Sequence, residues 1–185
     1  MSQENVEIVR QPVAVGTRSR RRLEERLALR FPRLFALAAR GVWRLPPHSR
    51  LRRALIGRAI RLGYEAANRA DHDATFLLYH PDCESIVPSQ LAALGEPGAR
   101  GREERIRWQK KWRAEWGEFR FEPDEVIDLG DRQLVVGHIR GSGLASGVSV
   151  ESEWAVLFNS AAGRVIREQI FADHREALEA AGLSE

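Results

Sequence analysis

The spacing of apolar residues changes once along this chain, at Gly117. Before Gly117 apolar residues recur at helical spacing, whereas the stretches after it alternate between apolar and polar residues, as half-buried strands do. Helices followed by consecutive strands predict an α+β protein, in which neighbouring strands form one antiparallel sheet and the helices pack on one of its faces. We expect strands at 118–130, 132–143, 148–158 and 164–173.

The helical stretches carry recognisable start and stop signals. Residues 18–40 have leucines near helical spacing, with Pro32 expected to kink or split the helix and Gly41 to end it. A second helix is expected over 50–68, with Ser49 as its N-cap. Further helices are expected at 101–117 and 174–183, with a short one after Asp71.

Charge is distributed unevenly along the chain, although the net charge is only +3. Residues 1–64 contain 15 Arg and 4 Glu, a net charge of +11, which leaves −8 for residues 65–185. A basic arm before an acidic domain suggests that the arm meets nucleic acid, an anionic lipid surface or the acidic domain itself.

The sequence gives limited information on the cellular compartment of the protein and on its cofactors. Cys83 is the single cysteine, which excludes an internal disulfide and agrees with a reducing environment. We expect no signal peptide and no membrane span, because the apolar stretch at 34–45 is too short, and we predict a cytoplasmic protein. No spacing of His, Cys, Asp or Glu indicates a metal site, and no cofactor is expected.

Three of the five tryptophans, Trp108, Trp112 and Trp116, are four residues apart. On one helix they would share a stripe about 80° wide. Trp154 alternates with apolar residues on its strand, opposite Glu151 and Glu153, so its side chain should point inward.

We expect Trp112 and Trp154 to meet across a cavity, with Tyr64 and Phe171 near them. Two interpretations remain open at this point. The aromatic side chains could fill the core, since each buries about 150–250 Å². They could instead form an aromatic cage for a planar apolar ligand.

Several stretches, in their order and spacing, resemble the SnoaL-like polyketide cyclase family of the nuclear-transport-factor-2-like superfamily. They span about residues 57–183 and read YEAANRADHD, YHPDCE, FEPDEVIDLGD and GRVIREQIFADHREALEAAGL. The resemblance implies a cone over residues 57–185, with a curved antiparallel sheet around helices and an apolar pocket inside. Residues 1–56 would then be a basic helical extension, and a homodimer through the sheet is implied.

The resemblance also bears on catalytic residues. Ketosteroid isomerases of this superfamily use two acidic residues, and the aligned positions here are Val87 and Trp154. Neither side chain transfers protons, so the isomerase mechanism is not expected. Val87 and Ser85 are instead expected to line the pocket.

Three ionisable residues are candidates for chemistry. His138 could act as acid or base in the pocket, or it could be a histidine on the sheet surface. Asp173 matches the cavity aspartate that SnoaL-type cyclases use, but it is also placed to cap the last helix. Tyr64 would donate a hydrogen bond to a developing oxyanion.

The favoured function is therefore binding of a small apolar carbonyl compound, with isomerase-, cyclase- or dehydratase-type acid/base chemistry if the protein is an enzyme. The alternative is a non-catalytic dimeric association domain whose basic hairpin, residues 18–61, docks on an anionic membrane or a protein partner. The leucines of the hairpin could also simply pack on the cone. Nucleic acid is not expected, because RSRRR has no interleaved aromatic residues.

Overall fold

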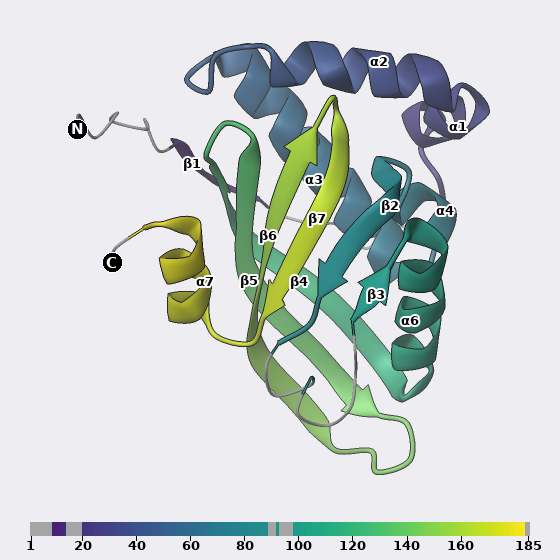
Figure 1. Cartoon of the computed structure of the whole chain (residues 1–185). Coiled ribbons are helices and arrows are strands. Elements are labelled where there is room, and N and C mark those ends of the chain that lie inside the picture. The colour runs from purple at the N-terminus through teal and green to yellow at the C-terminus, as the bar shows by residue number, and fades with distance from the viewer. Residues whose placement is uncertain (1–8, 14–19, 89–91, 93–97, 184–185) are drawn as a thin grey trace.

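The computed structural model describes residues 9–13, 20–88, 92 and 98–183, and within them a curved, unclosed seven-stranded sheet is accompanied by helices (Figure 1). The predicted α+β class is confirmed. The strand order is β1-β4-β5-β6-β7-β2-β3. The strands are β1 (Val9–Pro12), β2 (Tyr79–Ile86), β3 (Ala99–Arg100), β4 (Trp116–Asp128), β5 (Arg132–Gly143), β6 (Ser149–Ala161) and β7 (Arg164–Phe171).

Strands β4 to β7 follow one another as an antiparallel meander, as predicted. The predicted bounds of β5 are those of the structure, and the other three strands differ by a few residues at their ends. Strand β2 adds to the far side of β7 in parallel. Strand β1 was not predicted; it pairs antiparallel with the edge of β4 through four residues.

The described helices are α1 (Leu23–Arg30), α2 (Pro32–Trp43), α3 (Arg50–Asn68), α4 (His72–Thr75), α6 (Arg102–Ala114) and α7 (His174–Ala181). Pro32 is the first residue of α2, so the predicted split is confirmed; proline fits there because a first-turn N–H needs no helical partner. The prediction that Gly41 ends this helix is wrong, since α2 continues to Trp43. Ser49 caps α3, accepting a hydrogen bond from the Arg52 backbone N–H, as predicted.

The sheet packs against helices on both faces because successive side chains point to opposite sides. Val135 and Val156 lie on the concave face and form one core with α3 and α6. Leu134 and Leu157 lie on the opposite face and form a second core with α7. This two-sided burial explains why parts of β5 and β6 are continuous apolar runs rather than alternating ones.

Helices α1 and α2, residues 23–43, form a strap across one end of the sheet (Figure 1). The strap touches the turn between β6 and β7, where a Cβ atom on Gly163 would come within 2.5 Å of the Arg40 backbone nitrogen. Its end is held by Arg52, which is 1% exposed, pairs with Asp128 at 2.7 Å and donates to the Trp43 carbonyl at 2.9 Å. The basic segment therefore continues directly into the fold of the cone.

The predicted boundary between residues 56 and 57 falls inside α3, which runs unbroken from Arg50 to Asn68. Strand β1, from the predicted extension, belongs to the same sheet as the cone. Among the described helices, none is both long enough and apolar enough to cross a membrane.

Candidate functional site

A cavity of about 370 Å³ lies between the concave face of the sheet and the helices α3 and α6. All five tryptophans of the chain line it, including Trp43 at the end of the strap, which the sequence had not placed in the cone. The volume falls within the range typical of small-molecule sites, about 300–1,000 Å³. The aromatic residues therefore line the cavity without filling it.

The three evenly spaced tryptophans form one wall, but not on one helix. Helix α6 ends at Ala114, and Trp116 is the first residue of β4, so the prediction of a single helical stripe is wrong. The rings nevertheless remain in contact. Trp108 and Trp112 stack with centroids 6.2 Å apart, and Trp116 follows 5.4 Å from Trp112.

Trp154, on β6, is buried and points into the cavity, as expected. Its ring meets Tyr64 edge-on at 5.2 Å and lies 5.1 Å from Phe121. Phe121 also lies 6.1 Å from Trp112. The two tryptophans expected to meet across the cavity are thus linked through Phe121.

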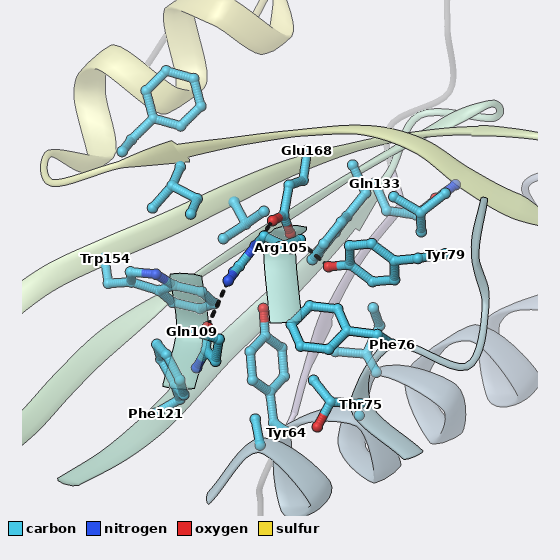
Figure 2. Close-up of a pocket in the computed structure, with 18 of the residues that line it drawn as sticks. Tyr64, Thr75, Phe76, Tyr79, Arg105, Gln109, Phe121, Gln133, Trp154 and Glu168 are labelled. Carbon is cyan, nitrogen blue, oxygen red and sulfur yellow. Dashed lines mark hydrogen bonds and ion pairs between the residues drawn. The ribbon is translucent and has the colours of Figure 1, made fainter. Parts of the chain in front are cut away.

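A buried polar cluster lies inside these apolar walls, and the sequence did not predict it (Figure 2). Glu168 of β7, only 2% exposed, accepts a hydrogen bond from the Tyr79 hydroxyl at 2.5 Å and pairs with the Arg105 guanidinium. Arg105 also donates to the Gln109 side-chain oxygen at 2.7 Å. Its guanidinium lies over the Trp108 ring at 4.8 Å, a cation–π contact.

Tyr64, from α3, points its hydroxyl toward this cluster (Figure 2). The hydroxyl is buried and has no hydrogen-bond partner among the described residues. Burial raises the pKa of Tyr64 well above its usual value, and the nearby charge of Glu168 raises it further. The phenol therefore stays protonated at neutral pH and offers an O–H donor to the cavity.

The two other ionisable candidates lie elsewhere. His138 was considered as an acid or base in the pocket, but Ile139 takes the inward position on β5, so His138 points to the outer face. There its imidazole lies 2.9 Å from Asp124. Asp173 caps α7, accepting from the Glu176 backbone N–H at 2.9 Å, and does not line the cavity. Both cavity placements are therefore corrected.

The remaining predicted pocket residues divide into two groups. Phe171 lines the cavity near the end of β7 and also contacts the core beneath α7. Ser85 and Val87 are buried, but neither lines the cavity, which their neighbour Pro88 does. Their predicted place in the pocket is therefore corrected, although Ser85 is in register with Glu168 of β7, which does line the cavity.

A second cavity, also about 370 Å³, lies between the strap and the helices α3 and α4. It shares wall residues with the main cavity, among them Trp43, Ile56 and Thr75. The Trp43 indole N–H is buried and has no hydrogen-bond partner among the described residues. The underside of the strap thus forms part of the wall of both cavities.

Comparison with known proteins adds to this geometry. The family model described as SnoaL-like domain matches residues 60–168. No curated protein matches the chain. A nuclear-transport-factor-2-like protein of unknown function from Burkholderia pseudomallei K96243 is 25% identical, with a TM-score of 0.57 over 66% of this chain and 93% of its own.

Two further solved structures have the same fold. A nuclear-transport-factor-2-like protein from Burkholderia thailandensis E264 is 25% identical, with a TM-score of 0.55 over 68% of this chain and 93% of its own. A protein named as a putative SnoaL-like polyketide cyclase from Jannaschia sp. CCS1 is 20% identical, with a TM-score of 0.54 over 69% of this chain and 92% of its own. At this identity, the similarity to the Jannaschia protein shows a shared fold and nothing more.

Proposed function

Because the chain belongs to the SnoaL-like domain family, we propose that it binds a small, largely apolar carbonyl compound in the main cavity and catalyses proton transfer on it. One observation carries this proposal. The cavity is largely apolar, and its buried polar groups include the Glu168 carboxylate, which is paired with Arg105, and the Tyr64 hydroxyl, which has no partner among the described residues.

The polar groups suggest separate roles. The Tyr64 O–H donates to the carbonyl oxygen of the ligand, while the carboxylate of Glu168 removes a proton from the carbon next to that carbonyl. Negative charge then develops on the carbonyl oxygen, and the Tyr64 hydroxyl and the Arg105 guanidinium stabilise it in surroundings that exclude water. Return of the proton to another atom of the ligand completes an isomerisation or allows a ring closure.

The apolar walls suggest the shape of the ligand. Trp108 and Trp112 have nearly parallel rings, 9° apart in plane, and Phe121 and Trp154 add further rings to the lining. Several flat rings in one lining favour a planar or polycyclic compound, whose faces they would cover. Of the three ionisable candidates from the sequence, Tyr64 is again proposed as the donor to the oxyanion, and Glu168 is proposed as the acid/base group in place of His138 and Asp173.

Ligand binding is tested by tryptophan fluorescence, since all five indoles line the cavity. Titration with planar and aliphatic carbonyl compounds should produce a saturable change with at least one class. Tyr64→Phe should weaken the binding of that compound about tenfold, because one hydrogen bond is lost. The corresponding hydrocarbon, which lacks the carbonyl oxygen, should bind the wild type and Tyr64→Phe with equal affinity. If none of the compounds changed the tryptophan emission, this result would contradict the proposal.

Proton transfer is tested by incubating bound compounds in deuterated water and measuring deuterium uptake by mass spectrometry. Glu168→Gln should lower the exchange rate about 100-fold or more, because the base is removed. Glu168→Asp keeps the negative charge on a side chain that is one methylene shorter, so it should retain part of the exchange rate. Circular dichroism and fluorescence titration verify that both variants fold and bind. Equal exchange in Glu168→Gln and the wild type would remove Glu168 from the chemistry.

A further inference from the structure

The strap exposes an unusual amount of apolar side chain. Eleven large apolar residues are exposed among the described residues; five of them lie on the strap, and two more lie near the start of α3. Leu23 is 72% exposed, and Leu34 and Leu37 are each 64% exposed. The expectation that the leucines of the hairpin pack on the cone is therefore wrong. Scattered apolar residues are ordinary on a surface, whereas a cluster of this kind marks an interaction site.

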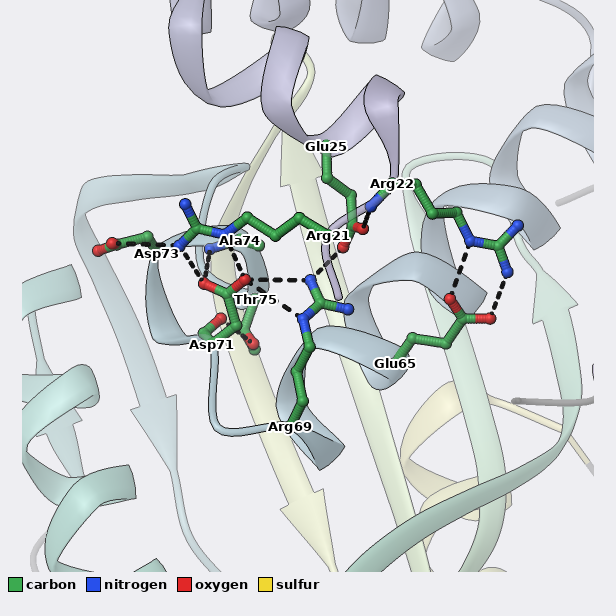
Figure 3. A network of polar contacts seen from close by, with 9 residues as sticks. All are labelled: Arg21, Arg22, Glu25, Glu65, Arg69, Asp71, Asp73, Ala74 and Thr75. Carbon is green, nitrogen blue, oxygen red and sulfur yellow. Dashed lines mark hydrogen bonds and ion pairs between the residues drawn. The ribbon is translucent and has the colours of Figure 1, made fainter. Parts of the chain in front are cut away.

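The underside of the strap is fixed, so this exposure is a property of the folded protein (Figure 3). Arg22, just before α1, pairs with the buried Glu65 at 2.7 Å, and Arg69 pairs with Glu25 of α1. Arg21 forms two hydrogen bonds of 2.6 Å with Asp71. The arginines that face the cone are therefore neutralised by acidic side chains.

The outward arginines differ from these. The structure shows no ion pair with any described residue for the five exposed arginines of the strap and its end. They are Arg26, Arg30, Arg33, Arg40 and Arg44. No Asp or Glu occurs in the sequence between Glu25 and Glu65, so α2 and the chain that follows it to Tyr64 contribute only positive charge.

Leucines and arginines lie side by side on the outer face of α2. At about 100° per residue, Arg33, Arg40 and Arg44 fall within about 40° of one another, and Leu37 and Leu34 follow within about the next 80°. The inner face carries Ala39 and other residues in contact with the cone. A basic edge beside an apolar stripe is the arrangement of helices that lie in a membrane interface.

We propose that the outer face of the strap docks on an anionic lipid surface, with the leucines entering the interface and the outward arginines contacting the headgroups. Anionic lipid satisfies both features of this face, because acyl chains accept the leucines and phosphate groups accept the arginines. Nucleic acid would leave the leucines exposed to water, and an apolar protein groove would leave five arginines unpaired. The proposal does not depend on the chemistry of the cavity.

Vesicle flotation tests the proposal. The wild-type protein should float with vesicles of phosphatidylglycerol and phosphatidylcholine, bind vesicles of phosphatidylcholine alone much less, and dissociate progressively as salt is raised. Leu34→Glu/Leu37→Glu should reduce flotation about tenfold or more. Leu144→Glu/Val148→Glu is the matched control, because these residues are 66% and 62% exposed on the distant turn between β5 and β6; it should float like the wild type.

Three results would overturn the proposal. The first is no flotation of the wild type with phosphatidylglycerol at low salt. The second is equal loss in the strap variant and the control variant. The third is a dimer in solution that the strap variant dissociates, without vesicle binding, which would make this face an interface between two copies of the chain. Thermal unfolding of both variants establishes that they remain folded.

Discussion

Tyr64 and Tyr79 are the only two tyrosines of the chain, and their hydroxyls have different partners. Tyr79 donates to Glu168, so its O–H is already used within the protein. Tyr64 points at the same cluster and has no partner among the described residues. Burial raises the pKa of both phenols, so both remain donors at neutral pH. Only Tyr64 keeps its donor for a ligand.

The residues of this cluster were partly predictable. Arg105 and Gln109 extend the stripe of Trp108 and Trp112 by one helical turn, so the sequence contains a signal for them. Glu168 has no such signal, because both alternating sets of residues on β7 mix polar and apolar side chains. Its role depends on Tyr79, 89 positions earlier, and only the parallel pairing of β2 with β7 brings them together.

Asp71 makes the stability of the protein depend on pH. Hydrogen bonds from Arg21 lower the pKa of Asp71 from 3.8 to about 2. The unfolded chain therefore takes up this proton first, so the stabilisation is present above about pH 4 and is lost as the pH falls toward 2. We expect Asp71→Asn to cost about 1–2 kcal/mol at pH 7, because Arg21 is partly exposed and water screens the pair.

Urea unfolding at pH 7 and at pH 3 measures this effect. The wild type should lose more stability than Asp71→Asn between the two conditions. Asp73→Asn is the control, since Asp73 is 75% exposed and lies 3.6 Å from the same arginine; it should behave like the wild type. Identical pH profiles for all three proteins would rule out Asp71 as a source of the acid sensitivity.

At the level of elements, contact between the strap and the cone depends on Gly163. This residue has φ +80°, and an added Cβ would lie 2.5 Å from the Arg40 backbone nitrogen and 2.9 Å from its Cα. Because those are backbone atoms, α2 itself would have to move. We predict that Gly163→Ala destabilises the protein by about 1–3 kcal/mol and speeds hydrogen exchange in α2.

Gly182→Ala provides the matched control. Gly182, at the end of α7, has φ +78°, but its added Cβ would meet nothing within 4 Å. It should therefore show the cost of backbone strain without faster exchange in α2. If both variants changed α2 exchange equally, the close contact at Gly163 would not be what holds the strap.

Elements were easier to predict from the sequence than their ends and contacts. Local signals such as Pro32 and Ser49 placed helix boundaries correctly, because proline and capping residues act within one turn. Trp116 was placed on the helix because its spacing fits, yet the chain turns into β4 there. Strand β1 is too short to show alternation and exists only through pairing with β4.

Over the whole molecule, the asymmetry of charge in the sequence becomes an asymmetry of surfaces. The basic segment packs against the acidic cone, because buried ion pairs such as Arg52 with Asp128 join them. For the five exposed arginines of the strap and its end, the structure shows no ion pair with a described residue. The cone and the strap therefore present two surfaces with different proposed partners, a ligand inside and a lipid surface outside.

The parallel pairing of β2 with β7 has a further consequence for synthesis of the chain. Tyr79 leaves the ribosome 89 residues before Glu168, and at about 5–20 residues per second this gap takes on the order of 5–20 s. During that time the apolar inner face of the unfinished sheet has no closing strand, and contacts between distant segments are slow to form. A chain that stopped before β7 would lack the strand that joins β2 to β6, and we expect it to aggregate, because the apolar residues of the inner face would stay exposed.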